Sequence, residues 1–237
     1  MTADQHDLAT TVEAVIDRMR RIGQDLDPLD GVACFNRMYL QVTELVAANL
    51  VEGFFDDAPF VERLDVVFAN LYFHNVDAAP RGHKPEACWA PLFEARDDRT
   101  IWPVQFALAG MNAHINHDLA LAVVQTCKER GTTPSTPPVH ADFLKVNELL
   151  AKAESQVRQS FETQLVRLAT KDAEALKHIV GSFSIARARD AAWATVTMLW
   201  PQRDTAFLFD GSTATLAQTV GTAGRLLLTP VIPPPAQ

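Results

Sequence analysis

An apolar stretch from Leu108 to Val124, LAGMNAHINHDLALAVV, carries five strongly polar side chains at its centre. These five are Asn112, His114, Asn116, His117 and Asp118. A helix that is apolar on nearly all sides is normally buried, and polar groups buried with it must find partners. The sequence therefore predicts a buried central helix over about residues 101–129, with a polar site built into its middle.

Residues three and four positions apart are neighbours on a helix surface. This spacing places one stripe along the predicted central helix: Gly110, His114, His117, Asp118 and Leu121. Two imidazoles and a carboxylate then project toward the same space, and the glycine lets another backbone or a ligand come close. We interpret this stripe as the candidate functional site of the chain.

The rest of the chain also shows apolar residues at helical spacing, and no segment has the sustained alternation typical of strands. Capping residues stand before several segments: Asp30, Asp56 or Asp57, Thr100 or Asp98, and Ser182 or Ser184. The expected helices cover about residues 8–23, 30–53, 57–79, 86–94, 101–129, 143–168, 172–200 with a break near 181, and 212–228. We therefore expect one compact all-α domain over residues 1–237, a bundle of about seven or eight helices with irregular ends at 1–7 and 229–237.

Charge and hydropathy exclude some function classes. A net charge of −8 and a pI near 5.3 argue against nucleic-acid binding, which needs a basic surface. The start MTADQHDLATT lacks the features of a secretory signal, and no run of about 18 apolar residues offers a membrane span. We expect a cytoplasmic protein whose unpaired Cys34, Cys88 and Cys127 are buried or free thiols.

Polar residues on two other helices extend the candidate site. Arg63, Asn70, His74 and Asp77 share one stripe of the helix that follows Asp57, and they form a candidate second wall of a polar interior. Asn36, Thr43 and Glu44 recur near one face of the preceding helix, which could also offer polar groups inward. The later segment IARARDAAWATVTMLW contains two arginines. One of them could reach inward to a carboxylate or a substrate anion, but the favoured interpretation is a surface ion pair.

The leading hypothesis is a metal-dependent enzyme, with a hydrolase favoured, that acts on a small organic molecule. His114, His117 and Asp118 would bind zinc, iron or manganese, and His74 or His140 would complete the ligand set. The metal would polarise a substrate oxygen or activate water. The remaining candidate residues are Asp118, Glu44 and Asn112 for catalysis and Asn70, Asn116, Arg63 and Tyr39 for substrate binding.

Two alternatives remain open. In the first, a metal-free pocket of the cyclase or isomerase type uses Asp118 or His114 as acid or base. In the second, the protein is a non-enzymatic ligand-binding or scaffold protein whose polar core is a structural hydrogen-bond network. The H-E-x-x-H, G-x-S-x-G and glycine-rich phosphate-loop motifs are absent. Apolar helix faces can be buried between two copies, so a homo-oligomer also remains open.

Four segments, FALAGMNAHINHDLALAV, DGVACFNRMYL, RLDVVFANLYF and SIARARDAAWATVTMLW, resemble a bacterial and fungal family of uncharacterised domains. The similarity runs from about Asp30 to Leu228, and GMNAHINHDL is its most specific element. The resemblance implies a compact helical domain. It assigns no activity, and so it transfers no catalytic role to any residue.

Overall fold

The computed structural model describes residues 8–78, 80–150, 181 and 183–231, and within these residues the chain is helical, without strands. The α-helices are α1 (Val12–Asp25), α2 (Gly31–Val51), α3 (Ala58–Ala78), α4 (Ala90–Ala95), α5 (Pro103–Ala113), α6 (Leu119–Glu129), α9 (Ile185–Leu199) and α10 (Ala206–Leu227). A π-helical turn, η2 (His114–Asp118), joins α5 to α6, a 3-10 turn, η3 (Trp200–Gln202), follows α9, and residues 139–150 are also helical. The predicted all-α fold is confirmed. Most of the helix expected over 143–168, and the first part of that expected over 172–200, lie outside the described residues.

The capping residues set several helix starts as predicted. Asp30 accepts hydrogen bonds from the backbone N–H groups of the first turn of α2, and Asp57 accepts one from the backbone N–H of Phe60. Ser184 caps α9 through the N–H of Arg187. Each side chain satisfies a backbone donor that has no partner inside its helix.

The start of the central helix differs from the prediction. Neither Asp98 nor Thr100 caps it, because the Asp98 carboxylate instead accepts a hydrogen bond from the backbone N–H of Thr100. The helix begins after Trp102, with Pro103 in its first turn, and the Gln105 side chain accepts a hydrogen bond from the Trp102 N–H at 3.2 Å. A glutamine side chain at the third position of a helix can accept a hydrogen bond from the backbone N–H of the residue that precedes the helix.

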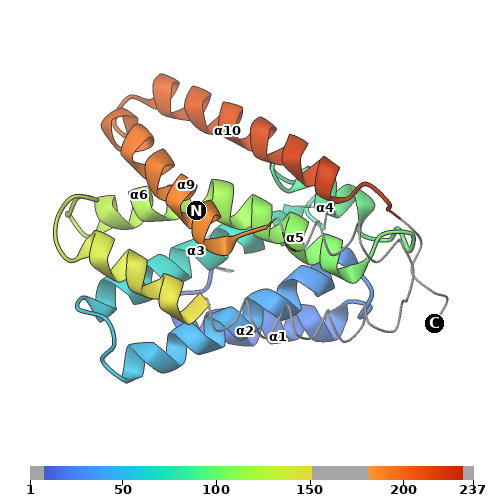
Figure 1. Cartoon of the computed structure of the whole chain (residues 1–237), viewed down its shortest axis with the longest axis horizontal. Coiled ribbons are helices and arrows are strands. Elements are labelled where there is room, and N and C mark those ends of the chain that lie inside the picture. The colour runs from blue at the N-terminus through green and yellow to red at the C-terminus, as the bar shows by residue number, and fades with distance from the viewer. Residues whose placement is uncertain (1–7, 79, 151–180, 182, 232–237) are drawn as a thin grey trace.

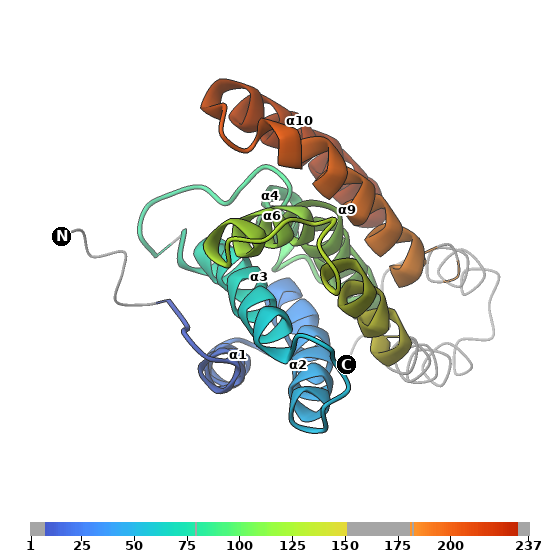
Figure 2. The ribbon, with the colours of Figure 1, turned by 90° about the vertical axis from the view of Figure 1, so that its left-hand side faces the viewer.

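The central helix, α5 through η2 to α6, crosses the middle of the bundle, and the other helices pack around it (Figure 1). α2 and α10 pack on α5, while α3 and α9 pack on α6. α1 lies on the outer side of α2 and α3, and α10 crosses the opposite side of the molecule (Figure 2). Every residue of α5 from Val104 to Ala113 is buried, as its apolar composition predicts.

Two glycines allow the closest contacts around the central helix. A Cβ atom at Gly110 would overlap with the ring of Phe35, so the missing side chain lets α2 approach α5. A Cβ at Gly221 would overlap with the carbonyl oxygen of Ala87, so α10 contacts the loop before α4 directly. At Gly110 a phenylalanine ring fills the space that was predicted for a backbone or a ligand.

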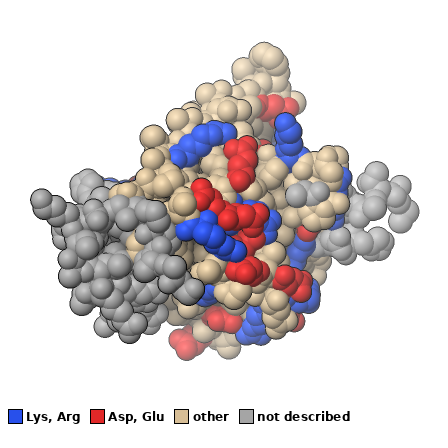
Figure 3. Space-filling model, turned by 90° about the vertical axis from the view of Figure 1, so that its right-hand side faces the viewer, with Lys and Arg blue, Asp and Glu red and all other residues tan. Residues whose placement is uncertain are grey.

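The described surface mixes charges of both signs. On the face drawn in Figure 3, basic and acidic side chains lie next to one another without an extended area of one sign. Ion pairs link neighbouring helices, for example Arg18 of α1 with Asp77 of α3 at 2.7 Å. None of the described helices combines the length and the apolar character that crossing a bilayer would require.

Candidate functional site

The central helix changes its winding where its polar residues lie. Residues 114–118 form one π-helical turn between two regular α-helices. Such single turns are rare and occur frequently at functional sites. The turn keeps His114 and Asp118 in contact while it also brings His117 to the same carboxylate.

The Asp118 carboxylate is the centre of a buried hydrogen-bond network. Its Oδ2 atom lies 3.0 Å from His114 Nδ1 and 2.9 Å from Trp89 Nε1, and its Oδ1 atom lies 2.7 Å from His117 Nδ1. Burial raises the pKa of Asp118, but the hydrogen bonds from His114 and His117 lower it, and the net pKa is below its usual range. The carboxylate is therefore ionised, and all three nitrogens donate to it.

His114 presents its second nitrogen to the interior. Because Nδ1 donates to Asp118, Nε2 carries a lone pair, and this atom is buried without a hydrogen-bond partner. The ring of Phe68 stacks on the imidazole with centroids 3.5 Å apart, and the ring of Tyr39 meets it edge-on at 4.4 Å. Burial lowers the pKa of His114 more than Asp118 raises it, so the imidazole is neutral at pH 7 and can accept a proton.

A cavity of about 80 Å³ lies beside His114, between α2, α3 and the central helix. Its walls are largely apolar, with Phe35, Met38, Phe68, Met111, Ile115 and Leu119 among the described lining residues. Four titratable side chains also line it: Tyr39, Asp65, His114 and Arg189. Three of these have a buried atom without a partner, namely the Tyr39 hydroxyl, Asp65 Oδ2 and His114 Nε2. Unsatisfied buried polar atoms are uncommon, and three around one cavity are suited to binding a polar ligand group.

Asp65 contributes to this cavity a carboxyl group whose pKa is unusually high. It projects from α3 into the space that His114 also lines. It makes no hydrogen bond or ion pair with any other described residue. Burial raises its pKa from 3.8 to about 7. Asp65 can therefore give up or take a proton near neutral pH, whereas burial raises the pKa of Tyr39 and keeps that hydroxyl protonated.

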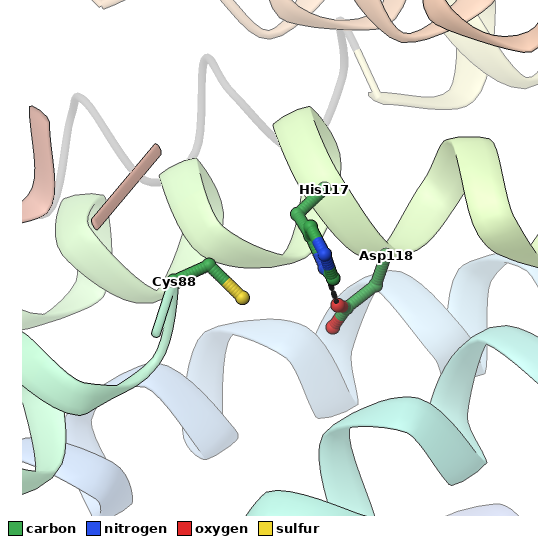
Figure 4. Close-up of side chains that lie close together, drawn as sticks. All are labelled: Cys88, His117 and Asp118. Carbon is green, nitrogen blue, oxygen red and sulfur yellow. Dashed lines mark hydrogen bonds and ion pairs between the residues drawn. The ribbon is translucent and has the colours of Figure 1, made fainter. Parts of the chain in front are cut away.

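A second group of side chains lies on the other side of Asp118. The ligand atoms of Cys88, His117 and Asp118 lie within 4.8 Å of one another, and all three residues are buried. Figure 4 shows the Cys88 sulfur pointing toward His117 and Asp118. Sulfur, imidazole nitrogen and carboxylate oxygen are all ligands that zinc accepts. His114, predicted as a ligand, does not belong to this group. Sequence reasoning missed Cys88 because it precedes His117 and Asp118 by 29 and 30 residues and has no motif. The helix expected over 86–94 begins only at Ala90, so Cys88 lies in the turn before it.

Other predicted metal and catalytic residues do not reach the network. His74 is exposed on α3, and His140 is exposed and stacks on Trp193 with ring centroids 4.2 Å apart. Glu44 faces solvent and pairs with Arg20 at 2.8 Å. None of these three residues lies at the site where the sequence placed it, because each is on the outer face of its helix.

The predicted polar wall of α3 binds neighbouring elements instead. Arg63 pairs with Glu129 at 2.6 Å, and the Asn70 side chain exchanges hydrogen bonds of 3.0 and 2.9 Å with the backbone of Ala9. The stripe that faces the cavity lies one or two positions further around the helix and includes Asp65 and Phe68. A shift of one position on a helix changes which face a residue occupies, and the polar pattern alone did not reveal it.

Asn112 joins the central helix to α10, and Asn116 holds the Asn112 side chain in place. The Asn112 amide donates to the Val220 carbonyl at 2.9 Å, and Asn116 donates to Asn112 Oδ1 at 3.2 Å. Neither is among the described residues that line the cavity, whereas Tyr39, predicted with them as a substrate contact, does line it.

Arg189 differs most from the prediction, because a surface ion pair was favoured for this segment. The residue is only 4% exposed, and it donates to the carbonyl oxygen of Phe143 at 2.7 Å and to the side chain of Asn147. A signal was present in the sequence, since Arg189 lies four residues after Ile185 and seven before Val196, both of which are buried.

Comparison with known proteins gives one kind of match. A family model described as a family of unknown function (DUF5995) matches residues 12–230. No curated protein and no solved structure matches the chain significantly.

Proposed function

The chain belongs to DUF5995, a family of unknown function, and we propose that it is an acid–base enzyme that moves a proton on a small, largely apolar organic molecule. One observation carries the proposal. A neutral histidine held by a buried carboxylate presents an unpartnered nitrogen, His114 Nε2, to a cavity that also contains an unpartnered carboxyl and a phenol. This is the combination that general acid–base catalysis requires.

His114 is the base in this proposal. Its Nε2 atom takes a proton from a C–H group that a neighbouring carbonyl makes acidic, and the ionised Asp118 stabilises the imidazolium through the Nδ1–H hydrogen bond. The Tyr39 hydroxyl donates a hydrogen bond to the enolate oxygen that forms.

Asp65 completes the proton balance. In its protonated form it delivers a proton to the γ-carbon of the dienolate that a β,γ-unsaturated ketone forms. After the product leaves, His114 loses its proton to solvent and the Asp65 carboxylate takes one from solvent, so that both groups return to their starting states. The net reaction moves one hydrogen within the molecule, as an isomerase does. No serine, threonine or cysteine is found among the described lining residues, so they offer no hydroxyl or thiol nucleophile of the kind that His114 would activate in a serine or cysteine hydrolase. Hydrolysis by this site would have to use a water molecule activated by His114.

The test is hydrogen exchange in D2O over a panel of small cyclic ketones and β,γ-unsaturated ketones, followed by NMR. We expect deuterium incorporation or double-bond migration in the parent protein, slowed about 10²- to 10⁴-fold in His114→Gln, because the base is removed. His74→Gln changes an exposed histidine and should exchange like the parent. Equal rates in the parent and His114→Gln would contradict the proposal.

A divalent metal ion at Cys88, His117 and Asp118 is a second candidate, favoured by the 4.8 Å grouping of their ligand atoms. Zinc, iron or manganese bound there would polarise a substrate oxygen or activate water. Binding would require the Cys88 thiol to lose its proton, although burial raises its pKa, and the hydrogen bond between His117 and Asp118 to rearrange.

Elemental analysis of protein purified without a metal-affinity tag separates the two candidates. If the ion is part of the site, the parent should contain close to one equivalent, and Cys88→Ser should lose it. Cys127→Ser removes another buried thiol as the matched control and should keep the metal. A parent free of metal after incubation with zinc, ferrous iron and manganese would exclude the metal candidate, and chelator-resistant exchange would favour His114 acting alone.

A further inference from the structure

We infer that the cavity beside His114 binds a small monocarboxylic acid, whose carboxylate pairs with Arg189. This inference rests on the proposed function, because it takes the same cavity as the substrate site, and it adds the chemical class of the substrate. It assigns the ligand a charge and a polarity that the acid–base groups alone do not define.

The inference is based on a buried cation, Arg189, that has no buried anion beside it among the described residues. The Arg189 guanidinium donates only to neutral acceptors, the Phe143 carbonyl and the Asn147 side chain, and it lies over the Phe143 ring at 4.1 Å. Within the part of the chain that the structure describes, no ion pair joins it to a carboxylate, although the charge of Asp190 raises its pKa against the larger effect of burial. Its neighbour in sequence, Asp190, is exposed. Buried charges in proteins are normally paired, so this guanidinium is suited to an anion brought by a ligand.

Asp65 does not fill this role. It lines the same cavity as Arg189, yet the two form no ion pair, and Asp65 Oδ2 is without any partner. Burial alone raises the pKa of Asp65, with no opposing effect from a nearby cation. Burial lowers the pKa of Arg189 to about 9, which still leaves the guanidinium charged at pH 7. The cavity therefore offers one positive group and one carboxyl group that is only partly ionised at pH 7.

The walls define the rest of the ligand. Val42, Val146, Leu150 and Ile185 are among the apolar residues that line the cavity with Arg189, and its volume is about 80 Å³. A guanidinium binds a carboxylate through two parallel N–H donors, and apolar walls favour a short aliphatic or alicyclic body. No lysine and no second arginine are found among the described lining residues, so a single negative charge fits better than a phosphate dianion.

Calorimetric titration with butanoate, hexanoate and cyclohexanecarboxylate, beside the matching alcohols, tests this inference. In the parent we expect each acid to bind at least tenfold more tightly than its alcohol. Arg189→Met keeps an unbranched side chain without the charge and should weaken acid binding about 10- to 100-fold, with little effect on the alcohols. Arg187→Met, at an exposed arginine two residues away on α9, is the matched control and should bind like the parent.

Three results would overturn the inference: no acid binding by the parent, equal binding of acids and alcohols, or unchanged acid binding in Arg189→Met. The comparison of acids with alcohols uses the parent alone and stays decisive if Arg189→Met does not fold. Hexyl phosphate that binds more tightly than hexanoate would overturn the carboxylate class. His114→Gln should still bind the acids. If the parent binds the acids but catalyses no proton exchange, only the proposed function is refuted. If the parent catalyses proton exchange but does not bind the acids, only this inference is refuted.

Discussion

Asp118→Ala is expected to lower the free energy of unfolding by about 3–5 kcal/mol, because it removes the common acceptor of a buried network. The N–H groups of His114, His117 and Trp89 would each lose a partner in surroundings that water does not reach. Urea denaturation at pH 7, followed by circular dichroism, measures the change. The same variant should also lose the proposed proton-transfer activity, since His114 would no longer be held in the tautomer with a free Nε2.

Two comparisons sharpen this expectation. Asp118→Asn keeps one acceptor oxygen but turns an amide donor toward N–H groups, so its loss of stability should be intermediate. Asp98→Ala removes an exposed carboxylate whose described hydrogen bonds all come from Thr100, and its denaturation midpoint should stay close to that of the parent. A midpoint for Asp118→Ala equal to that of the parent would show that the network contributes nothing to stability.

Asp65→Asn is expected to stabilise the protein by about 4 kcal/mol above pH 7, while leaving its stability nearly unchanged below pH 4. The folded-state pKa of about 7 lies above the ordinary value of 3.8, so folding favours the protonated acid. As pH rises from about 4 to 7, the unfolded chain ionises Asp65 freely, and the folded parent loses stability before levelling off. Asparagine cannot ionise and escapes this loss.

The measurement is the difference in unfolding free energy between parent and Asp65→Asn at pH 4, 5.5, 7 and 8. Tyr39, His114 and Arg189, the other titratable groups that line the cavity, are common to both proteins and largely cancel in the difference. Asp97→Asn, at an exposed position, is the control and should show no such trend. A difference that stays constant across this range would contradict the raised pKa. Stabilisation with loss of activity would be the usual trade-off at a functional site.

Local signals explain why much of the fold could be predicted from the sequence. The caps at Asp30 and Asp57 and the glycine ends at Gly53 and Gly131, both with positive φ, depend only on residues a few positions apart. The apolar composition around residues 103–113 correctly predicted a buried central helix. These features need no knowledge of what packs against them.

The site was predicted only in part, because its remaining members come together through tertiary packing. His114, His117 and Asp118 were recognised from their position in an apolar helix, but Cys88 and Trp89 lie close to Asp118 only because the turn before α4 packs against the central helix. Asp65 could have been suspected as a lone carboxylate between Leu64 and Val66, both buried. Its lack of a partner could not be foreseen, since that depends on every surrounding helix.

The π turn also affects how the central helix should be aligned with other sequences. A π turn accommodates one residue more than an α-helical turn, and each residue of an α-helix advances the rotation by about 100°. The apolar faces of α5 and α6 therefore follow two periodic patterns that are out of phase by one residue. In evolutionary terms the turn is equivalent to a single-residue insertion, and an alignment with an uninterrupted helix requires a one-residue gap between 113 and 119. Without that gap, every position on one side of Asp118 is compared with the wrong face.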